Sequence, residues 1–211
     1  MFGNGMKYLA VCAVVGTMLA ACGSAQISSH SGGWYRQHSG VMPRADGRLY
    51  VCHGFGCAYK TPVDFSPAQL SKLRNILARG GASPAAERQA IAKAVAWNEA
   101  RVAPTVGSAN DVGGYDLRNS GQRGQMDCID EATNTTSLLL VMQAKGYLRH
   151  HEVVSPVARG FFIDGEYPHA TAVVREKESG RAYAIDSWPR GNAQMPVVQD
   201  LESWFAAIPG A

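Results

Sequence analysis

Clusters of basic residues and long hydrophobic runs are both scarce in this 211-residue chain. The formal net charge is only +3, and the lysines and arginines are scattered, which argues against a nucleic-acid partner. The 23 glycines and 10 prolines are too few for a collagen-like or low-complexity chain. One apolar run, residues 8–21, has about 14 residues, and a membrane-spanning helix needs roughly 20. The rest of the chain is long enough for one domain with its own core.

The N-terminal apolar run has the features of a secretory signal. Lys7 precedes it, and it closes on the letters LAAC at positions 19–22. A positive start, an apolar centre and a small-residue ending are typical of a cleaved signal peptide. The ending resembles the bacterial lipobox, which implies that residues 1–21 are removed and that Cys22 becomes a lipidated N-terminus. Plain secretion, with Cys22 an ordinary residue near the cut, is the alternative.

The residues after Cys22 indicate where the anchored protein resides and where its domain begins. Cys22 is followed by glycine and serine and lacks the aspartate that favours retention in the inner membrane, so we expect the outer membrane, facing the periplasm. Between Gly23 and Arg48 there are five serines, five glycines and no apolar periodicity. This composition predicts a flexible tether over residues 22–48 and a domain over residues 49–211. Docking of Trp34 and Tyr35 on the domain is the alternative.

Two short β-type runs flank a glycine-containing loop early in the domain. Residues 49–52 and 58–61 predict a hairpin in which Cys52 and Cys57 face each other across the loop. An oxidising compartment lets a disulfide between them persist. Unpaired thiols, or a metal site that includes His53, are the alternatives. A zinc site usually needs four ligands, and no second Cys/His pair or calcium-loop spacing is present, so we expect no metal and no cofactor.

The remaining patterns predict an α+β fold. Helix-start signals stand at Ser66-Pro67 and Ser83-Pro84, and the second helix is expected to run to Trp97. A polar connection without periodicity follows over residues 101–125. A third helix is then expected from Cys128 to Lys145, with Asp127 as its N-cap. Short β-type runs follow at residues 152–154, 170–174 and 182–185. Helices followed by a helix and an antiparallel meander are typical of α+β domains.

Of the five cysteines, Cys128 has no role in targeting or in the predicted disulfide. Cys12 lies in the signal, Cys22 takes the lipid, and Cys52 and Cys57 form the expected pair. Cys128 begins the third predicted helix, where unsatisfied backbone N–H groups and the helix dipole favour a thiolate and lower the thiol pKa. A cysteine nucleophile has this requirement. A buried structural thiol is the alternative.

His169 and Asp186 are the candidate partners of Cys128. His169 opens one predicted strand and Asp186 closes the next. If the turn between them centres on residues 177–178, the two are cross-strand neighbours, and the carboxylate holds the imidazole in one tautomer. A register shift of one residue would put them on opposite faces. A strand-end histidine beside a solvated aspartate is the alternative.

The other five histidines are weaker candidates for a catalytic base. His30 and His38 lie in the predicted tether, and His53 lies in the hairpin loop. His150 and His151 precede a predicted edge strand, where one of them is expected to face solvent. His169 is therefore the histidine that we pair with Cys128.

Three segments together resemble the core of the transglutaminase-like, papain-related cysteine hydrolases. They read GQMDCIDEA at 124–132, PHATAVV at 168–174 and YAIDSW at 183–188. The resemblance covers roughly residues 85–190 and extends to proteobacterial lipoproteins with this core. It implies a papain/transglutaminase-like fold with N-terminal helices and a helix packed on an antiparallel meander. It also implies Cys128 as nucleophile, His169 as general base and then acid, and Asp186 as the residue that orients His169.

The chain departs from the family pattern at two places. Ala170 follows the histidine where many relatives carry an aromatic residue, and Met126-Asp127 replaces the commoner small or Gly-Asp lead-in. For the oxyanion, the backbone N–H of Cys128 is the natural donor. Papain-like enzymes carry a glutamine a few residues before the nucleophile, which favours Gln122 over Gln125 as a second donor; a solvated glutamine is the alternative.

These observations predict a lipid-anchored thiol hydrolase (a peptidase or amidase) or an acyltransferase that works through an acyl-enzyme. The expected substrate is a peptide or protein, with peptidoglycan stems as one candidate, and Tyr115 and Trp188 are candidate cleft walls. The alternative is a non-catalytic module that binds peptides or envelope proteins in the same cleft. A papain-like cell-wall endopeptidase of another lineage fits less well, because Ile129 stands where such enzymes carry serine after the cysteine.

Overall fold

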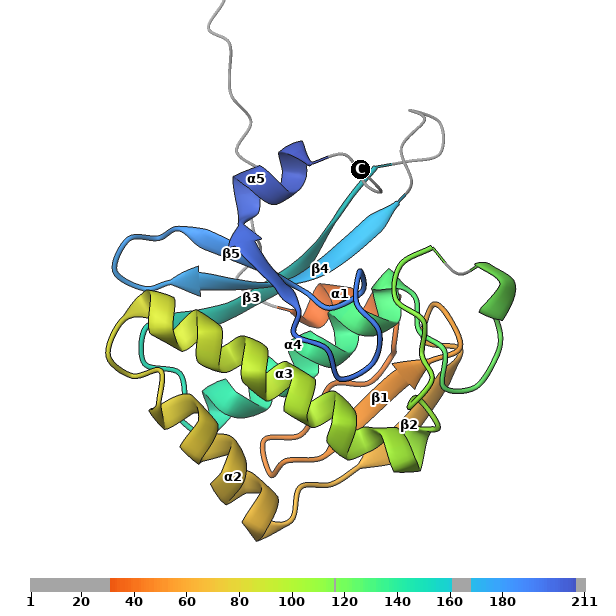
Figure 1. The fold of residues 1–211 in the computed structure, drawn as a ribbon, viewed down its shortest axis with the longest axis horizontal. Helices are drawn as coiled ribbons and strands as arrows, with labels where there is room; N and C mark the ends of the chain where they lie inside the picture. The colour runs from red at the N-terminus through yellow and green to blue at the C-terminus, as the bar shows by residue number, and fades with distance from the viewer. Residues whose placement is uncertain (1–30, 116, 161–167, 208–211) are drawn as a thin grey trace, which may run out of the picture.

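The computed structural model describes residues 31–115, 117–160 and 168–207. The predicted signal peptide over residues 1–21 and the candidate lipidation site Cys22 lie outside the described residues. The chain forms helices and two antiparallel sheets, as the α+β prediction requires (Figure 1). Among the described helices, none has both the length and the apolar character needed to cross a bilayer.

The elements follow one another as helices first and sheet second, apart from an early hairpin. In chain order they are α1 (Gly32–Gln37), β1 (Leu49–His53), β2 (Tyr59–Val63), α2 (Pro67–Ala78), α3 (Pro84–Val106), the short 3₁₀ turn η1 (Leu117–Asn119), α4 (Cys128–Ala144), β3 (His151–Arg159), β4 (His169–Glu176), β5 (Ala182–Asp186), β6 (Val197–Asp200) and α5 (Leu201–Ala206).

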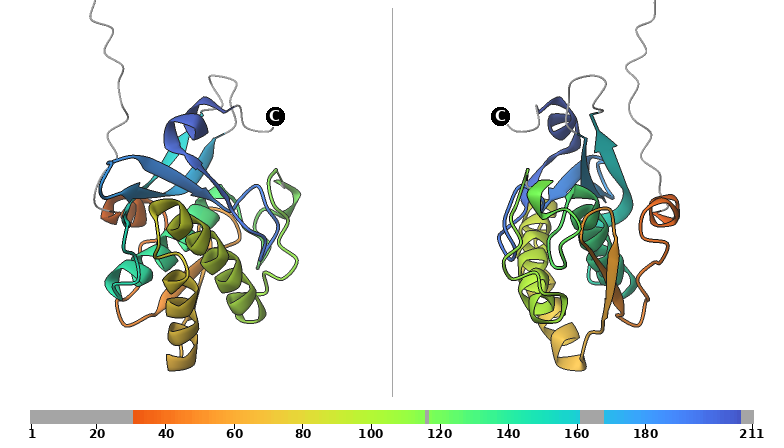
Figure 2. Two further views of the ribbon diagram at one scale, coloured as in Figure 1. Left: turned by 60° about the vertical axis from the view of Figure 1, so that its left-hand side comes forward. Right: turned by 90° about the vertical axis from the view of Figure 1, so that its right-hand side faces the viewer.

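Helix α4 lies in the middle of the molecule. It packs against β1 of the two-stranded hairpin and against β3 and β4 of the four-stranded sheet, whose strand order is β3-β4-β5-β6 (Figures 1 and 2). Helix α3 packs on α4 and on α2. The shared core contains buried apolar side chains from all of these layers, including Leu73, Ile91, Val95, Leu138, Met142, Val174 and Ile185. Because α4 is covered on several sides, the position of its first turn is set by tertiary packing.

Helices α2 and α4 begin and end close to their predicted bounds, whereas α3 is longer than predicted. Helix α3 continues past Trp97 to Val106, because Val102, Ala103 and Val106 extend its buried face. Pro104 removes only one backbone donor, close to the end of the helix. The helix ends at Gly107, whose φ of 84° suits a left-handed C-cap.

Residues 31–48 are folded onto the domain, so the predicted tether is wrong over this stretch. Trp34 and Tyr35 of α1 are buried, with 9% and 2% of their surface exposed. The Trp34 indole N–H donates to the Thr133 hydroxyl at 2.8 Å, and the Tyr35 hydroxyl bonds that of Ser137 at the same distance. Aromatic residues dock when an apolar face and a polar partner are both available. The alternative, docking of Trp34 and Tyr35 on the domain, is therefore confirmed, and residues 31–48 belong to the folded domain.

The strand registers differ from the predicted ones without separating the expected partners. In the hairpin, Cys52 faces Lys60 across the ladder, and Cys57 lies in the loop with a φ of 59°. In the sheet, Ala172 faces Ile185, which shifts the pairing by two residues, because the Glu176 amide bonds the Arg181 carbonyl across the turn. A shift of two residues leaves every side chain on its original face.

Candidate active site

Helix α4 begins at Cys128 with a capping box, as predicted from Asp127. The Asp127 carboxylate accepts the Asp130 amide at 2.9 Å, and the Asp130 carboxylate accepts the Asp127 amide at 3.4 Å. These two bonds satisfy backbone donors that the first helical turn would otherwise leave without partners. They also place the Cys128 amide at the open end of the helix.

The predicted disulfide between Cys52 and Cys57 is confirmed, and its loop is docked on this first turn. The buried Asp130 carboxylate accepts the amides of Phe55 and Cys57 at 2.8 and 2.6 Å. Burial, followed by the neighbouring charge of Asp127, raises the pKa of Asp130 well above its usual range. The amide of Gly56, in the same loop, donates to the Asp127 carboxylate at 2.9 Å. The disulfide loop therefore fixes the start of α4.

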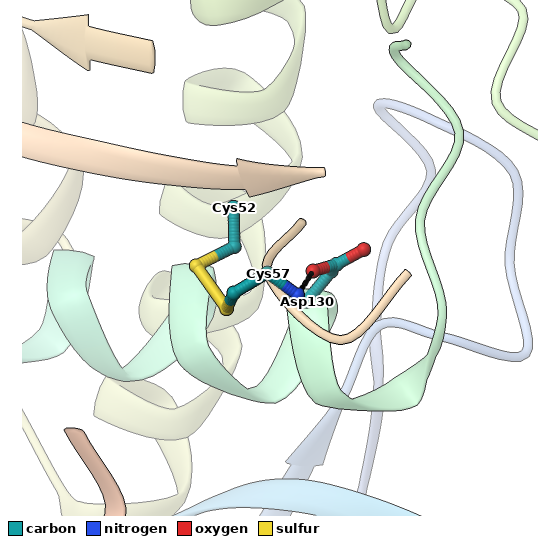
Figure 3. A group of neighbouring side chains, drawn as sticks. All are labelled: Cys52, Cys57 and Asp130. Carbon is teal, nitrogen blue, oxygen red and sulfur yellow. Dashed lines mark hydrogen bonds between the residues drawn. A yellow bond between two sulfur atoms is a disulfide. The ribbon is translucent and has the colours of Figure 1, made fainter. Parts of the chain in front are cut away.

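The sulfurs of Cys52 and Cys57 and a carboxylate oxygen of Asp130 lie within 4.8 Å of one another (Figure 3). Two thiolates and a carboxylate are ligands that zinc accepts. Both sulfurs are bonded to each other, however, so neither is a thiolate in the oxidised chain. Disulfide chemistry, and not metal binding, accounts for this group.

The Cys128 thiol is buried, and its pKa is higher than the position of Cys128 at a helix start predicts. It is 8% exposed and donates to the Pro168 carbonyl at 3.8 Å. Burial, followed by the negative charge of Asp127, raises the pKa of Cys128 to about 12. The prediction of a lowered pKa is therefore wrong, because loss of water outweighs the helix N-terminus. A neutral thiol needs a neighbouring base before it can attack.

His169 and Asp186 are brought together as predicted. Nε2 of His169 lies 2.6 Å from Oδ2 of Asp186, and both side chains are buried. Because a carboxylate only accepts, Nε2 carries the proton, and Nδ1 is then an acceptor. Among the described residues, Nδ1 has no hydrogen-bond partner although it is buried.

Cys128 lies beside His169. Its sulfur contacts the carbonyl of Pro168 and the amide of Ala170, the two residues that flank His169 in the chain. Cys128 and Ala170 also belong to one small apolar cluster with Trp188. The three predicted residues therefore meet where the start of α4 abuts the start of β4 and the end of β5.

Aromatic side chains surround the histidine. The Trp188 ring lies 4.5 Å from the His169 ring, and the Tyr115 ring lies 5.1 Å from that of Trp188 in an edge-on arrangement. Trp188 is buried, whereas Tyr115 is 48% exposed. The two candidate cleft walls thus form a row that leads from His169 to the surface.

The structure describes no hydrogen bond between the Gln122 side chain and the candidate site. Gln122 lies on an exposed turn where its amide bonds the Asn119 carbonyl. The Gln125 side chain, the weaker candidate, bonds the Asn110 carbonyl and the Val112 amide and so stabilises the connection before α4. The role of Gln122 as an oxyanion donor stays a prediction.

Two residues of the site were missed by sequence reasoning. The Trp204 indole N–H of α5 donates to the same Asp186 oxygen that contacts His169, at 2.8 Å. Glu131, one turn after Cys128, accepts the Ser187 hydroxyl at 2.6 Å. No local pattern marks Asp186 as the partner of Trp204, which lies 18 residues further along the chain. Glu131 directly follows Asp130 in the chain, but its burial depends on packing against α3 and the end of β5, which the sequence does not show.

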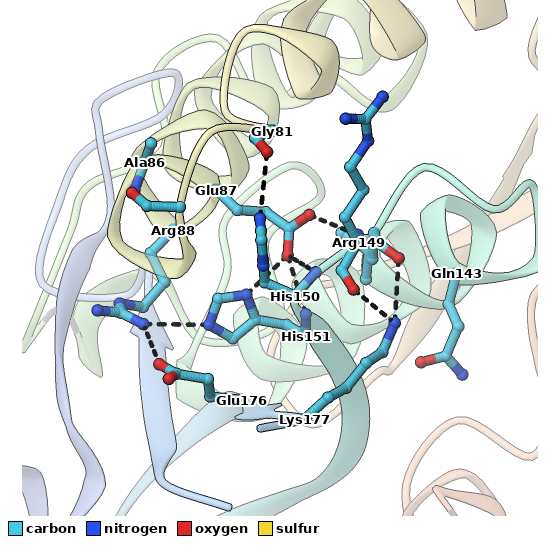
Figure 4. Close-up of polar contacts among 12 residues, drawn as sticks. Gly81, Ala86, Glu87, Arg88, Gln143, Arg149, His150, His151, Glu176 and Lys177 are labelled. Carbon is cyan, nitrogen blue, oxygen red and sulfur yellow. Dashed lines mark hydrogen bonds and ion pairs between the residues drawn. The ribbon is translucent and has the colours of Figure 1, made fainter. Parts of the chain in front are cut away.

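A second buried histidine, His151, is bonded at both ring nitrogens (Figure 4). Its Nδ1 lies 2.7 Å from Glu87 and its Nε2 lies 3.1 Å from the Arg88 guanidinium. His150 is half-buried and bonds the Gly81 carbonyl. The expectation that one of the two histidines faces solvent is therefore wrong. Glu87 draws both inward by accepting their backbone amides.

Comparisons with known proteins give no relative to set beside this geometry. No protein-family model, curated protein or solved structure matches the chain. What the site does is therefore inferred from its own residues and contacts.

Proposed function

We propose that this protein is a lipid-anchored thiol hydrolase of the bacterial cell envelope, a peptidase or amidase, or an acyltransferase of the same chemistry. Cys128 is the nucleophile, His169 the general base and then acid, and Asp186 the orienting carboxylate, on a transglutaminase-like, papain-related core. One observation carries the proposal. His169 is held by Asp186 through Nε2, while Nδ1, the nitrogen left as an acceptor, is buried without a described partner, and the Cys128 thiol contacts the carbonyl of Pro168, the residue before His169.

The chemistry follows from the protonation states of these groups. The Cys128 proton moves to Nδ1 of His169, and the thiolate attacks the carbonyl carbon of an amide. When the tetrahedral intermediate collapses, the carbon–nitrogen bond breaks and His169 gives its proton to the departing amine. Water, or an amine in the case of acyl transfer, then attacks the thioester with His169 again as base; the carbon–sulfur bond breaks, the acyl product leaves, and Cys128 takes the proton from His169. Asp186 stabilises the imidazolium that forms in each half-reaction.

The oxyanion in this scheme needs donors near Cys128. The Cys128 amide is one, because the first N–H groups of a helix have no intrahelical partner. Gln122 is the proposed second donor. It lies six residues before the nucleophile on the exposed turn, so the proposal requires that this turn move toward Cys128 when substrate binds.

The surroundings favour a peptide or protein substrate, and peptidoglycan stem peptides suit the proposed compartment. Tyr115 is exposed next to Trp188, and Val112 and Leu117 of the same connection are 50% and 64% exposed. Exposed apolar side chains beside a reactive centre are suited to contacts with substrate side chains. The proposed anchor at Cys22 and the proposed location at the periplasmic face of the outer membrane complete the proposal.

The deciding experiment is alkylation of Cys128 with iodoacetamide across pH, in the mature chain from residue 22 and in its His169→Ala variant. Modification is read by mass spectrometry on the peptide that contains Cys128. Because burial raises the pKa of the thiol, we expect its reaction at neutral pH to depend on His169 as base, so that the variant reacts more slowly and with a higher apparent pKa. If both chains react alike, with an ordinary or higher thiol pKa, the enzyme proposal fails.

The alternative, a non-catalytic peptide-binding module, is favoured by the burial of Cys128 and its raised pKa. In that case the thiol is a packing residue in the cluster with Trp188 and Ala170. This alternative predicts that Cys128→Ala leaves peptide binding nearly unchanged and that His169→Ala does not alter the reactivity of the thiol.

A further inference from the structure

A small cavity lies between α3, α4 and β1, and Glu131, one turn after Cys128, is among its lining residues. It offers about 20 Å³ to the centres of water molecules, which is room for about one water. Two acidic side chains line it, Glu99 from α3 and Glu131 from α4. Among the described residues that line the cavity, none is basic. Two carboxylates in a confined space without a cation do not both ionise readily.

Glu131 connects this cavity to the catalytic residues. It is 5% exposed and accepts the Ser187 hydroxyl at 2.6 Å, and Ser187 directly follows Asp186. The same hydroxyl lies 3.2 Å from that of Thr135, one turn further along α4. Glu131 and Thr135 thus hold the residue after Asp186 against the helix that begins with Cys128.

Glu99 faces the cavity from the other side. Its Oε2 accepts the Ala193 amide at 2.7 Å, whereas its Oε1 is buried and has no partner among the described residues. A buried carboxylate oxygen without a donor is costly. If Oε1 carries a proton, it becomes a donor that a single water in the cavity can link to Glu131.

We propose that Glu131 is a positioning residue for the Cys128–His169–Asp186 site and that it shares one proton with Glu99 across the cavity. The shared proton lets two acidic side chains lie together behind the site. It also keeps Glu131 available as the acceptor that holds Ser187. The positioning role rests on the proposed function, whereas the shared proton does not.

The charges around the pair agree with this arrangement. Burial, followed by the charge of Glu131, raises the pKa of Glu99 to about 9. Burial and then the charge of Asp186 raise the pKa of Glu131 to about 7, against the lowering effect of the Ser187 bond. The other charged groups that act on the pair, Asp111 and Asp127, are also acidic. The two carboxyl groups therefore titrate as a coupled pair, at a pH higher than that of ordinary glutamates.

The sign of the stability effect follows from the raised pKa values. A carboxyl with a raised pKa keeps its proton in the folded chain where the unfolded chain has already lost it. Its stabilising contribution is complete below the unfolded value near 4.5 and falls as pH rises toward about 7 for Glu131 and about 9 for Glu99. When both glutamates of the pair are ionised, the negative charge of Glu131 lies next to that of Asp186.

Urea unfolding of the mature chain between pH 5 and pH 9 tests the shared proton. The variants are Glu131→Gln, Glu99→Gln and the double substitution, with Glu178→Gln at an exposed position as control. Glutamine keeps the shape and hydrogen bonding of a protonated carboxyl. We expect the urea midpoint of the native chain to fall as pH rises and the double variant to lose the part of that slope due to the pair, while the control follows the native chain and Asp130, whose pKa is also raised, contributes equally to all variants. A native slope in the double variant would overturn the shared proton.

The pH profile of Cys128 alkylation tests the positioning role. We expect the native profile to contain a step between about pH 7 and 9 from ionisation of the pair, and Glu131→Gln to lose this step while Glu178→Gln keeps it. An unchanged profile in Glu131→Gln, in a chain that still responds to His169→Ala, overturns the positioning role alone. A chain whose thiol does not respond to His169→Ala overturns both the proposed function and the positioning role, and the urea series still decides the shared proton.

Discussion

His151 and His169 are both buried against a carboxylate, at opposite ends of the ladder that joins β3 and β4. His151 faces Glu176 across this ladder, and His169 faces Arg159. Glu87, the partner of His151, also accepts the backbone amides of residues 149, 150 and 151. Asp186, the partner of His169, accepts one further donor from Trp204, and its Oδ1 has no described partner.

The two histidines differ most at the second ring nitrogen. Nε2 of His151 accepts from Arg88, which also bonds Glu176, so every polar atom of that imidazole is satisfied (Figure 4). Nδ1 of His169 has no described partner. A closed network stabilises one conformation, whereas an open acceptor beside a thiol is free to take a proton. Burial and a carboxylate partner are thus common to both histidines, and only the open nitrogen distinguishes the one that we propose as the base.

The largest expected effect comes from removing the open nitrogen. His169→Ala should lower the rate at which Cys128 is alkylated at neutral pH by about 10²- to 10⁴-fold, the range that general acid–base catalysis supplies. The rate is read from the time course of modification of the peptide that contains Cys128. His151→Ala is the matched control, and its folded fraction should react at the native rate. Equal losses in both variants would remove the distinction between the two histidines.

The next largest effect should be on stability, and here we expect His151→Ala to lose more than His169→Ala. His151→Ala leaves the buried carboxylate of Glu87 and the guanidinium of Arg88 without their shared partner. Breaking a buried pair on one side costs about 3–5 kcal/mol, and the backbone amides that remain on Glu87 favour the lower end. Urea denaturation measures the loss. A loss in His169→Ala as large as that in His151→Ala would show that the two networks contribute equally.

Removing the disulfide should disturb the region around Cys128 and His169 and leave the region around His151 unchanged. Replacing Cys52 and Cys57 together by serine opens the loop that docks on Asp130, next to Cys128. For so short a loop, chain entropy predicts a loss of about 2 kcal/mol. We expect thermal unfolding to show this loss and alkylation of Cys128 to slow, because the start of α4 is less firmly held. A variant with native alkylation kinetics would show that the loop braces the fold without positioning the thiol.

The smallest effect should follow from Trp204→Phe. The substitution keeps an aromatic ring beside His169 and removes one donor to Asp186. Loss of a buried hydrogen bond to a charged group costs about 1.5–3 kcal/mol, and the partly conserved packing keeps the change near the lower figure. The thermal midpoint of unfolding measures it. Asp186 would prove to be held by His169 alone if the midpoint did not move.

The helices and the site were largely predictable because their signals are local. Ser66, Ser83 and Asp127 are N-caps that use side chains within three residues of their partners. The prediction that His169 contacts Asp186 is correct although the predicted register is wrong by two residues, because side chains alternate faces along a strand and a shift of two keeps them on the same face. The sequence offered docking of Trp34 only as an alternative and did not predict burial of His151, because their partners lie 99 and 64 residues away.

The pKa of Cys128 shows the limit of local reasoning most clearly. A helix start favours a thiolate, and that inference from sequence is sound as far as it goes. The side chain is nonetheless buried among Trp188, Ala170 and Ala132, which come from three different parts of the fold. Burial and the charge of Asp127 then raise the pKa of the thiol to about 12.

By itself the sequence determined which residues start the helices, which cysteines pair, and which three residues could meet as nucleophile, base and orienting carboxylate. These depend on side-chain type and on short-range spacing. Only the tertiary structure decided that residues 31–48 are packed on α4, that Glu131 and Glu99 share a cavity, and which buried histidine keeps an open nitrogen. Those features depend on burial and on partners far away in the chain, and local spacing does not encode either of them.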